Sequence, residues 1–320
     1  MSADTTKTYN NPIVLERADP WIYKHEDGYY YFTGSVPGYQ EIELRRAKTI
    51  NQLKTGEIKT IWHAHEKGPM SELIWAPEIH FIDGKWYINF AASDSANERT
   101  AKHHHRMFVL ENASPNPLEG EWVEKGQVIT HQESFSLDAT YFEHNGELYY
   151  VWAQLEPTIP GNSNLYISKM ENPWTLKGKT LILTTPTYDW ECVTYKVNEG
   201  AAVIKRNGKI FITYSGSATD ENYCMGLLWA DDTADLLDGF SWNKSPVPIF
   251  ASSEENQQFG PGHNSFTTSV DGTEDLLVYH ARPKKNDLSN PLNNPDRHAR
   301  VQVFNWDDNG FPIFGVPVAD

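Results

Sequence analysis

Residues 145–154 read NGELYYVWAQ, an Asn-Gly pair followed by a run rich in aromatic and aliphatic side chains. Such a pair between apolar runs is the strongest short-range signal of a β-hairpin, because its tight turn requires positive φ. The pattern occurs four more times: Asp27-Gly28 before YYYFTGS, Asp83-Gly84 before KWYINFAAS, Asn207-Gly208 before KIFITYSGS, and Asp271-Gly272 before TEDLLVYHA. The glycines at 28, 84, 146, 208 and 272 are 56, 62, 62 and 64 residues apart, so the chain contains a repeat.

Each repeat is long enough for a four-stranded sheet with its loops, and helical periodicity is nearly absent from the chain. Repeated four-stranded units without intervening helices indicate a β-propeller. Five repeats predict an all-β, five-bladed β-propeller that takes up residues 1–320 as a single domain. A β-sandwich with unrelated hairpins is the alternative fold.

The composition limits the classes of partner. The chain has 320 residues and a formal net charge of −16, which argues against nucleic acid and anionic membrane surfaces as partners. A neutral ligand is easier to reconcile with this charge. The two cysteines, Cys192 and Cys224, are too few for a disulfide framework or a four-ligand zinc site, and we interpret both as structural thiols.

The repeat predicts which side chains meet. Counting back nine residues from each hairpin glycine gives Asp19, Trp75, Leu137, Glu199 and His263. The third hairpin looks one residue shorter, so Asp138 replaces Leu137 as the equivalent position. The innermost strand of each blade lines the central channel. We therefore expect three carboxylates, one imidazole and one indole at one end of it.

This set of side chains favours one reaction. Glycoside hydrolysis needs two carboxyl groups and no cofactor: one protonates the leaving oxygen, and the other activates water or attacks the sugar. Acidic neighbours help to keep the acid protonated near neutral pH. Trp75 is suited to pack against the apolar face of a sugar. His263 is open to three interpretations: a structural histidine, a ligand to an ion or ordered water, or a substrate contact.

The sequence also resembles glycoside hydrolase family 43, from about Asn11 to Val318. The motifs that support the resemblance are ADPWI (18–22), WAPEI (75–79), SLDATYF (136–142), NEGAAV (198–203), GPGHNSF (260–266) and YHAR (279–282). The resemblance implies a five-bladed propeller and an inverting enzyme. One departure concerns the NEGAAV segment, where many members have proline at the position of Ala201.

The resemblance also implies a role for each motif residue. Asp19 corresponds to the general base, Glu199 to the general acid, and Asp138 to the third carboxylate that tunes and holds the acid. His263 corresponds to a channel histidine that coordinates calcium or a similar ion, mostly through waters. Two further positions, Trp75 and Arg282, correspond to residues that shape or reach the substrate pocket.

Glu191 is the main competitor for the role of acid. It lies in the sequence Trp190-Glu191-Cys192, which resembles the Glu-Cys pair of the related fructan-cleaving propellers. Those enzymes are retaining and also have an Arg-Asp-Pro near the middle of the chain. Here the corresponding segment is Leu137-Asp138-Ala139, and Glu191 is off the shared register.

The resemblance implies arabinofuranosyl or xylosyl substrates. We predict an exo-acting α-1,5-L-arabinofuranosidase of arabinan degradation, acting on arabino-oligosaccharides or a related pentose glycan. Endo-α-1,5-L-arabinanase and β-xylosidase are the alternatives within the family, and a non-catalytic sugar-binding propeller is the alternative outside it. Loops around 92–105, 154–164 and 284–297 are expected to decide between a pocket and an open groove. The oligomeric state is left open.

The N-terminal sequence gives an expectation for localisation. Residues 1–9 are polar and lack the charged-then-apolar pattern of a signal peptide, and no apolar run approaches the ~18 residues of a membrane helix. We therefore expect a cytoplasmic protein, or a secreted one if a leader was removed.

Overall fold

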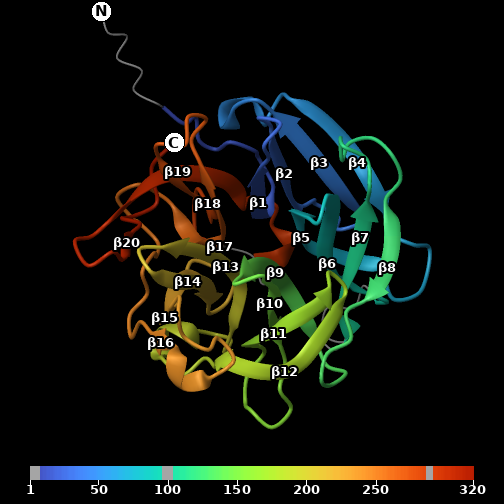
Figure 1. Ribbon diagram of the computed structural model, residues 1–320. Helices are drawn as coiled ribbons and strands as arrows, with labels where there is room; N and C mark the ends of the chain where they lie inside the picture. The colour runs from blue at the N-terminus through green and yellow to red at the C-terminus, as the bar shows by residue number, and fades with distance from the viewer. Residues whose placement is uncertain (1–7, 96–103, 286–290) are drawn as a thin grey trace, which may run out of the picture.

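The computed structural model describes residues 8–95, 104–285 and 291–320, and within them five four-stranded antiparallel sheets form a ring (Figure 1). Each sheet is one blade, formed by strands consecutive in the chain. Blade 1 consists of β1 (Ala18–Lys24), β2 (Tyr30–Ser35), β3 (Glu41–Ala47) and β4 (Glu57–His63). Blade 2 consists of β5 (Glu72–Ile82), β6 (Lys85–Ser93), β7 (Arg106–Asn112) and β8 (Val123–Gln127). The prediction of an all-β, five-bladed propeller is confirmed.

The remaining blades follow the same order. Blade 3 consists of β9 (Ser136–His144), β10 (Glu147–Gln154), β11 (Asn164–Asn172) and β12 (Thr175–Thr184). Blade 4 consists of β13 (Asn198–Arg206), β14 (Lys209–Gly216), β15 (Cys224–Asp231) and β16 (Asn243–Lys244). Blade 5 consists of β17 (Phe259–Thr268), β18 (Asp275–Arg282), β19 (His298–Trp306) and β20 (Pro312–Ile313).

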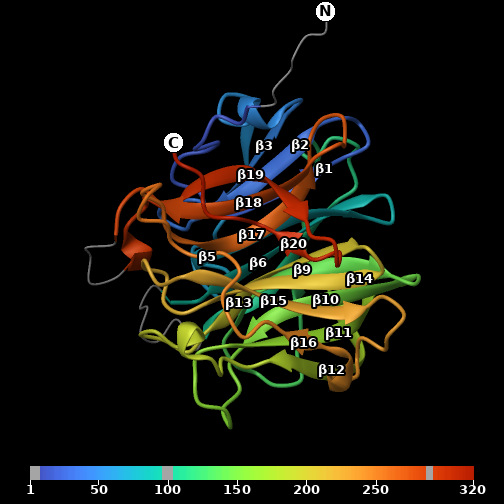
Figure 2. The same ribbon diagram turned by 90° about the vertical axis from the view of Figure 1, so that its left-hand side faces the viewer.

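Short 3-10 turns occur in the connections: η1 (Ile50–Gln52), η2 (Asp189–Glu191), η3 (Gly239–Ser241) and η4 (Pro291–Asn293). In the side view, the strands run between the two faces of the ring, and η4 (red) lies at the left-hand face (Figure 2). Among the described residues, no helix has the length and apolar character needed to cross a membrane.

Hydrophobic side chains hold the ring together. Among the described residues they form five clusters, each between two neighbouring blades. The cluster between blades 1 and 5 includes Ile22 and Val278, and the backbone of Ile13 donates a hydrogen bond to the carbonyl of Ala299. Burying a large aliphatic side chain stabilises a fold by about 1.5–3 kcal/mol, so these contacts close the ring between its first and last blades.

The five innermost strands, β1, β5, β9, β13 and β17, surround the centre of the ring, and each contacts the next (Figure 1). In each of them a β-bulge interrupts the register with the neighbouring strand at an equivalent place, and β5 and β17 have a second register shift nearer their start. At the shared bulge, one residue of each strand has positive φ: Asp19, Ala76, Asp138, Gly200 and His263. A bulge bends the strand and redirects a side chain, so the five bulges prepare one end of the channel for a site.

The bulges also correct the predicted register. Blades 2, 3 and 4 connect their first two strands by two-residue turns, such as Asn145-Gly146, in which both residues have positive φ. Blades 1 and 5 have longer connections at this place. The bulge therefore lies nine residues before the glycine in blades 1 and 5, but eight in the other three. Trp75 and Glu199 accordingly precede the bulge by one residue, whereas the sequence comparison placed them at the same register as Asp19.

Candidate active site

A cavity of about 630 Å³ opens at the bulged end of the channel. All three predicted carboxylates line it, together with His263 and Trp75. Further lining residues come from the connections between strands: Asn162, Tyr195, Pro291, Leu292 and Arg297. The structure therefore brings together five of the six residues predicted for the site, and Arg282 is the exception. The predicted loops 92–105 and 284–297 lie in part outside the described residues, because 96–103 and 286–290 are not described.

Asp19 lies among positively charged and hydrogen-bonding groups. Its Oδ1 atom is 3.3 Å from Nη1 of Arg297 and 3.2 Å from Nδ1 of His263. The Ser35 hydroxyl donates to Oδ2 at 2.5 Å. Burial acts to raise the pKa of the Asp19 carboxyl, but the charges of Arg297 and His263 outweigh it and hold this pKa well below its usual range. Asp19 is therefore ionised across the whole physiological pH range.

Glu199 has a different environment. Its carboxyl is partly exposed to the cavity and accepts a hydrogen bond from the Tyr223 hydroxyl at 3.0 Å. Enclosure in the cavity wall and the negative charge of Asp138 raise the pKa of Glu199 to about 8. Glu199 is therefore protonated at neutral pH and has a proton to donate.

The pKa of Asp138 lies between those of Asp19 and Glu199. Burial raises the pKa of Asp138; His263 lowers it and Asp19 raises it, and the result is a pKa of about 6. The carboxylate accepts a hydrogen bond from the backbone of Gly200, the residue that follows Glu199. Asp138 thus contacts the strand that holds Glu199 and also adds to the negative charge that keeps Glu199 protonated.

His263 bridges two of the carboxylates. Its Nδ1 atom is 3.2 Å from Asp19 and 3.7 Å from Asp138. Burial acts to lower the pKa of the imidazole, but the charges of Asp138 and Asp19 raise it to about 10. The backbone N–H of His263 donates to the Ser215 hydroxyl at 2.8 Å, which fixes the bulge. His263 is therefore a positively charged group held between two negative ones.

This arrangement does not fit an ion bound directly to Nδ1 of His263. A ring nitrogen that bears a proton has no free lone pair for a metal. Within residues 8–95, 104–285 and 291–320, no group of three or more His, Cys, Asp or Glu side chains is arranged to hold a metal ion. The calcium ion implied by the family resemblance therefore stays a prediction, and we derive no chemical step from it.

Trp75 forms one wall of the cavity. Its indole stacks on the ring of His105, with centroids 4.0 Å apart and planes inclined by 21°. Tyr39 meets the indole edge-on at 6.0 Å. The indole Nε1 is buried and has no protein hydrogen-bond partner. The ring is thus held in one orientation against the cavity, as the predicted sugar-packing role requires.

Arg282 lies behind the cavity wall. Its side chain is 1 % exposed and forms an ion pair with Asp296. It also donates to the carbonyls of Pro291 (2.7 Å) and Thr219 (3.2 Å), two residues that line the cavity. The structure therefore does not place Arg282 where it was predicted to reach the substrate; Arg282 supports the wall, and Arg297 is the arginine that faces the cavity.

Sequence reasoning missed Arg297, Ser35 and Tyr223. Arg297 and Tyr223 lie close to the site but at no repeated position, and we find no sequence signal for them. Ser35 did have a signal: Ser35 and Ser215 each follow their hairpin glycine by seven residues. Each accepts a hydrogen bond from a bulge N–H of the next blade, Ser35 from Ala76 and Ser215 from His263.

Glu191, the competing acid, does not line the cavity. Its side chain is fully buried, and its carboxylate accepts five different hydrogen-bond donors from blade 4 and the loop that precedes it. The placement gives no support to a retaining enzyme that uses Glu191 as its acid.

The fold and the site define a class: a five-bladed propeller with three carboxyl groups gathered at one end of its channel. The family model "Glycosyl hydrolases family 43" matches residues 9–312, and the chain belongs to this family. It is 53 % identical over 318 residues to a Streptomyces avermitilis protein named "extracellular exo-alpha-(1->5)-L-arabinofuranosidase", an alignment of 99 % of this chain and 65 % of that protein. The chain thus spans slightly less than two thirds of that relative's length.

Two further similar proteins are also named as arabinofuranosidases. A Streptomyces chartreusis protein of the same name is 52 % identical over 283 residues, which are 88 % of this chain and 85 % of that protein. The crystal structure of an α-L-arabinofuranosidase from Lactobacillus brevis superposes with a TM-score of 0.95 at 55 % sequence identity. That superposition covers 97 % of each chain.

Proposed function

We propose that this protein is an inverting glycoside hydrolase that releases terminal α-L-arabinofuranosyl residues from α-1,5-linked arabino-oligosaccharides. The observation that carries the proposal is the opposite protonation of two carboxyls lining one cavity. The pKa of Asp19 is held well below its usual range, and the pKa of Glu199 is raised to about 8. Such a separation is how an active site assigns a base and an acid to two carboxyl groups.

The proposed chemistry uses only side chains of this chain. Asp19, as the ionised group, accepts a proton from the attacking water. Glu199 gives its proton to the leaving glycosidic oxygen. Asp138 keeps Glu199 protonated and in place, and Trp75 packs against the sugar. No cofactor takes part, and thermal unfolding with and without a chelator tests the calcium ion predicted beside His263.

The choice of substrate follows the relatives named above, two of which are named as exo-acting α-1,5-L-arabinofuranosidases. Their names also describe extracellular proteins, and this favours the secreted alternative over the expected cytoplasmic location, to which they give no support. We further propose that residues 1–320 act as a single catalytic propeller.

Hydrolysis of linear α-1,5-arabino-oligosaccharides, followed by chromatography of the products, tests the proposal. We expect arabinose and the oligosaccharide shortened by one unit as the only early products. Early release of fragments of intermediate length would instead indicate an endo-acting arabinanase, and hydrolysis of xylosides but not arabinofuranosides a β-xylosidase. Binding without any turnover would indicate a sugar-binding propeller. NMR of the first-formed sugar should show the anomer opposite to that of the substrate.

A further inference from the structure

Glu191 lies at the centre of a buried polar cluster that the proposed chemistry does not use. The Glu191 cluster consists of Glu191 and its five donors: Thr187, Tyr188, Asn198, Tyr214 and Lys244. Two donors are backbone N–H groups, those of Thr187 (2.7 Å) and Tyr188 (2.8 Å). The remaining three are side chains from β13, β14 and β16.

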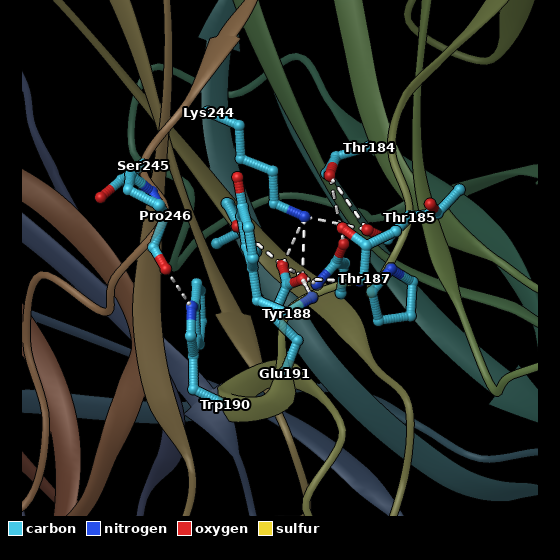
Figure 3. Close-up of polar contacts among 12 residues, drawn as sticks. Thr184, Thr185, Thr187, Tyr188, Trp190, Glu191, Lys244, Ser245 and Pro246 are labelled. Carbon is cyan, nitrogen blue, oxygen red and sulfur yellow. Dashed lines mark hydrogen bonds and ion pairs between the residues drawn. The ribbon is translucent and has the colours of Figure 1, made fainter.

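Figure 3 shows the Lys244 side chain directed toward the Glu191 carboxylate. Its Nζ atom is 2.7 Å from one carboxylate oxygen and 2.9 Å from the other, and it also donates to the carbonyl of Thr185 at 2.9 Å. Lys244 belongs to the outermost strand of blade 4. The ion pair therefore joins that strand to the loop that precedes the innermost strand.

The cluster is directly connected to the residue beside Glu199. The Asn198 side chain donates to Oε1 of Glu191 at 2.9 Å, and the Tyr214 hydroxyl donates to the same oxygen at 2.8 Å. Asn198 is the first residue of β13 and immediately precedes Glu199. The carboxylate thus fixes the start of the strand that presents Glu199 to the cavity.

The backbone of Glu191 supports the same wall. Its carbonyl accepts hydrogen bonds from the N–H groups of Val197 (3.2 Å) and Ser217 (3.3 Å), which both line the cavity. The close approach depends on Gly216, because a Cβ there would lie 3.2 Å from Cα of Glu191. Both the side chain and the backbone of Glu191 therefore act on the part of the wall that contains Glu199.

We propose that Glu191 is a positioning residue for Glu199: its buried carboxylate holds the 185–198 segment and thereby sets the place of the Glu199 carboxyl in the cavity. The inference rests on the proposed function, in which Glu199 is the acid. A carboxylate that already accepts five donors has no role as a proton donor to substrate, so Glu191 acts through Glu199 alone.

The test compares Glu191→Gln with Glu111→Gln as a matched control. Glu111, in blade 2, accepts from the Tyr87 hydroxyl (2.8 Å) and from Lys85 (3.2 Å) and does not line the cavity. Each variant is assayed on 4-nitrophenyl α-L-arabinofuranoside, whose leaving group needs little protonation, and on α-1,5-arabinobiose, whose leaving group depends on the acid. Each kcat/KM is measured as a function of pH.

Displacement of the Glu199 carboxyl should slow hydrolysis most for the substrate with the poorer leaving group, since general acid catalysis contributes about 10²- to 10⁴-fold to the rate. We expect Glu191→Gln to lower kcat/KM on arabinobiose at least roughly tenfold more than on the aryl substrate. The basic limb of its pH profile should move to lower pH, because water reaches Glu199. Glu111→Gln should match the wild type on both substrates.

Equal losses on both substrates with an unchanged basic limb would overturn the inference and leave Glu191 a purely structural residue. If Glu191→Gln does not fold, Tyr214→Phe removes a single donor to the carboxylate, with Tyr87→Phe as its control. The same selective loss, smaller in size, is expected, and a uniform loss would again overturn the inference. A wild-type protein that hydrolyses neither substrate would overturn the proposed function itself, and the inference with it.

Discussion

Blades 1 and 4 each contribute one carboxyl to the cavity, and the surroundings of the two carboxyls are opposite. Asp19 in blade 1 has a guanidinium, an imidazolium and a serine hydroxyl as partners. Glu199 in blade 4 has one tyrosine hydroxyl and lies in the field of Asp138. Both innermost strands have a bulge, but Asp19 is the residue with positive φ in its bulge whereas Glu199 immediately precedes that residue. Neighbouring side chains, several from other blades, decide which carboxyl holds a proton.

Removing either carboxyl should have the largest effect. We expect Asp19→Asn and Glu199→Gln each to lower kcat on arabinobiose by about 10²- to 10⁴-fold. The two variants should differ on 4-nitrophenyl α-L-arabinofuranoside, where Glu199→Gln recovers much of the loss because the leaving group needs little protonation. Asp19→Asn should be equally impaired on both substrates. Steady-state kinetics measures this, with circular dichroism to confirm folding.

Two results would break the assignment of acid and base. One is near-wild-type activity in either variant. The other is a reversed pattern, with the aryl substrate rescuing Asp19→Asn instead of Glu199→Gln. A retained basic limb near pH 8 in Glu199→Gln would also assign that limb to another group.

The sequence predicted the blades and all three carboxyl groups, because both depend on local patterns that repeat. The glycine of each of the five repeated pairs has positive φ, and these pairs lie at the predicted turns. The offset of the bulge was predicted less well: the third hairpin was recognised as shorter, but the second and fourth were not. That error follows from the turns of blades 2 and 4, whose two-residue form was not distinguished from the longer connections of blades 1 and 5.

The roles of the two arginines could not be read from sequence for a different reason. Arg282 lies in the YHAR motif at the end of β18, but Asp296 and backbone carbonyls of the following loop bind its guanidinium. Arg297 comes after the same loop in the sequence, and its guanidinium contacts Asp19 in blade 1. Which of the two faces the cavity depends on how the loop folds over the blade, and no repeat encodes that.

The second prediction concerns a substitution that removes positive charge beside Asp19 in blade 1. Arg297→Met should raise the pKa of Asp19 toward its ordinary value, because the guanidinium is the largest influence that lowers it. Asp19 must be ionised to act as a base, so activity should be lost at a higher pH than in the wild type as pH falls. With a pKa near the ordinary value of about 3.9, Asp19 would still be mostly ionised at pH 5, so we expect less than about a twofold loss in kcat/KM at pH 5 and above, and a loss of roughly tenfold near pH 3.

The measurement is the pH profile of kcat/KM between pH 3 and 9. Lys59→Met serves as a control, since Lys59 donates to the carbonyl of Leu118 and does not line the cavity. An acidic limb that stays in place in Arg297→Met would show that Arg297 does not keep Asp19 ionised.

The third prediction concerns His263, which lies between the two regions. Its imidazolium neutralises part of the charge of Asp19 and Asp138. His263→Gln should lower kcat about tenfold, since one buried charged hydrogen bond is worth about 1.5–3 kcal/mol and only part of it acts on the reaction. If the imidazolium alone neutralises the two carboxylates, a chelator should leave the melting temperature of the wild type unchanged.

The family resemblance predicts the opposite for the chelator. A fall in the wild-type melting temperature with EDTA, restored by calcium, would support a structural ion near His263 and contradict a site neutralised by the imidazolium alone. Calorimetry of the metal-stripped protein with added calcium gives a second readout that does not depend on activity.

The smallest effect should come from the blade 4 side, where one hydrogen bond reaches Glu199. The Tyr223 hydroxyl donates to Oε1 of Glu199 at 3.0 Å, and this bond lowers the pKa of Glu199 against the two larger effects of burial and Asp138. Tyr223→Phe removes the bond, so the pKa should rise and Glu199 should stay protonated to higher pH. The basic limb of kcat/KM should move up by less than about one pH unit, since a hydrogen bond of this kind is worth about 0.5–1.5 kcal/mol. A movement to lower pH would mean that Tyr223 stabilises the protonated acid, and blade 4 would then keep its proton by hydrogen bonding as well as by burial.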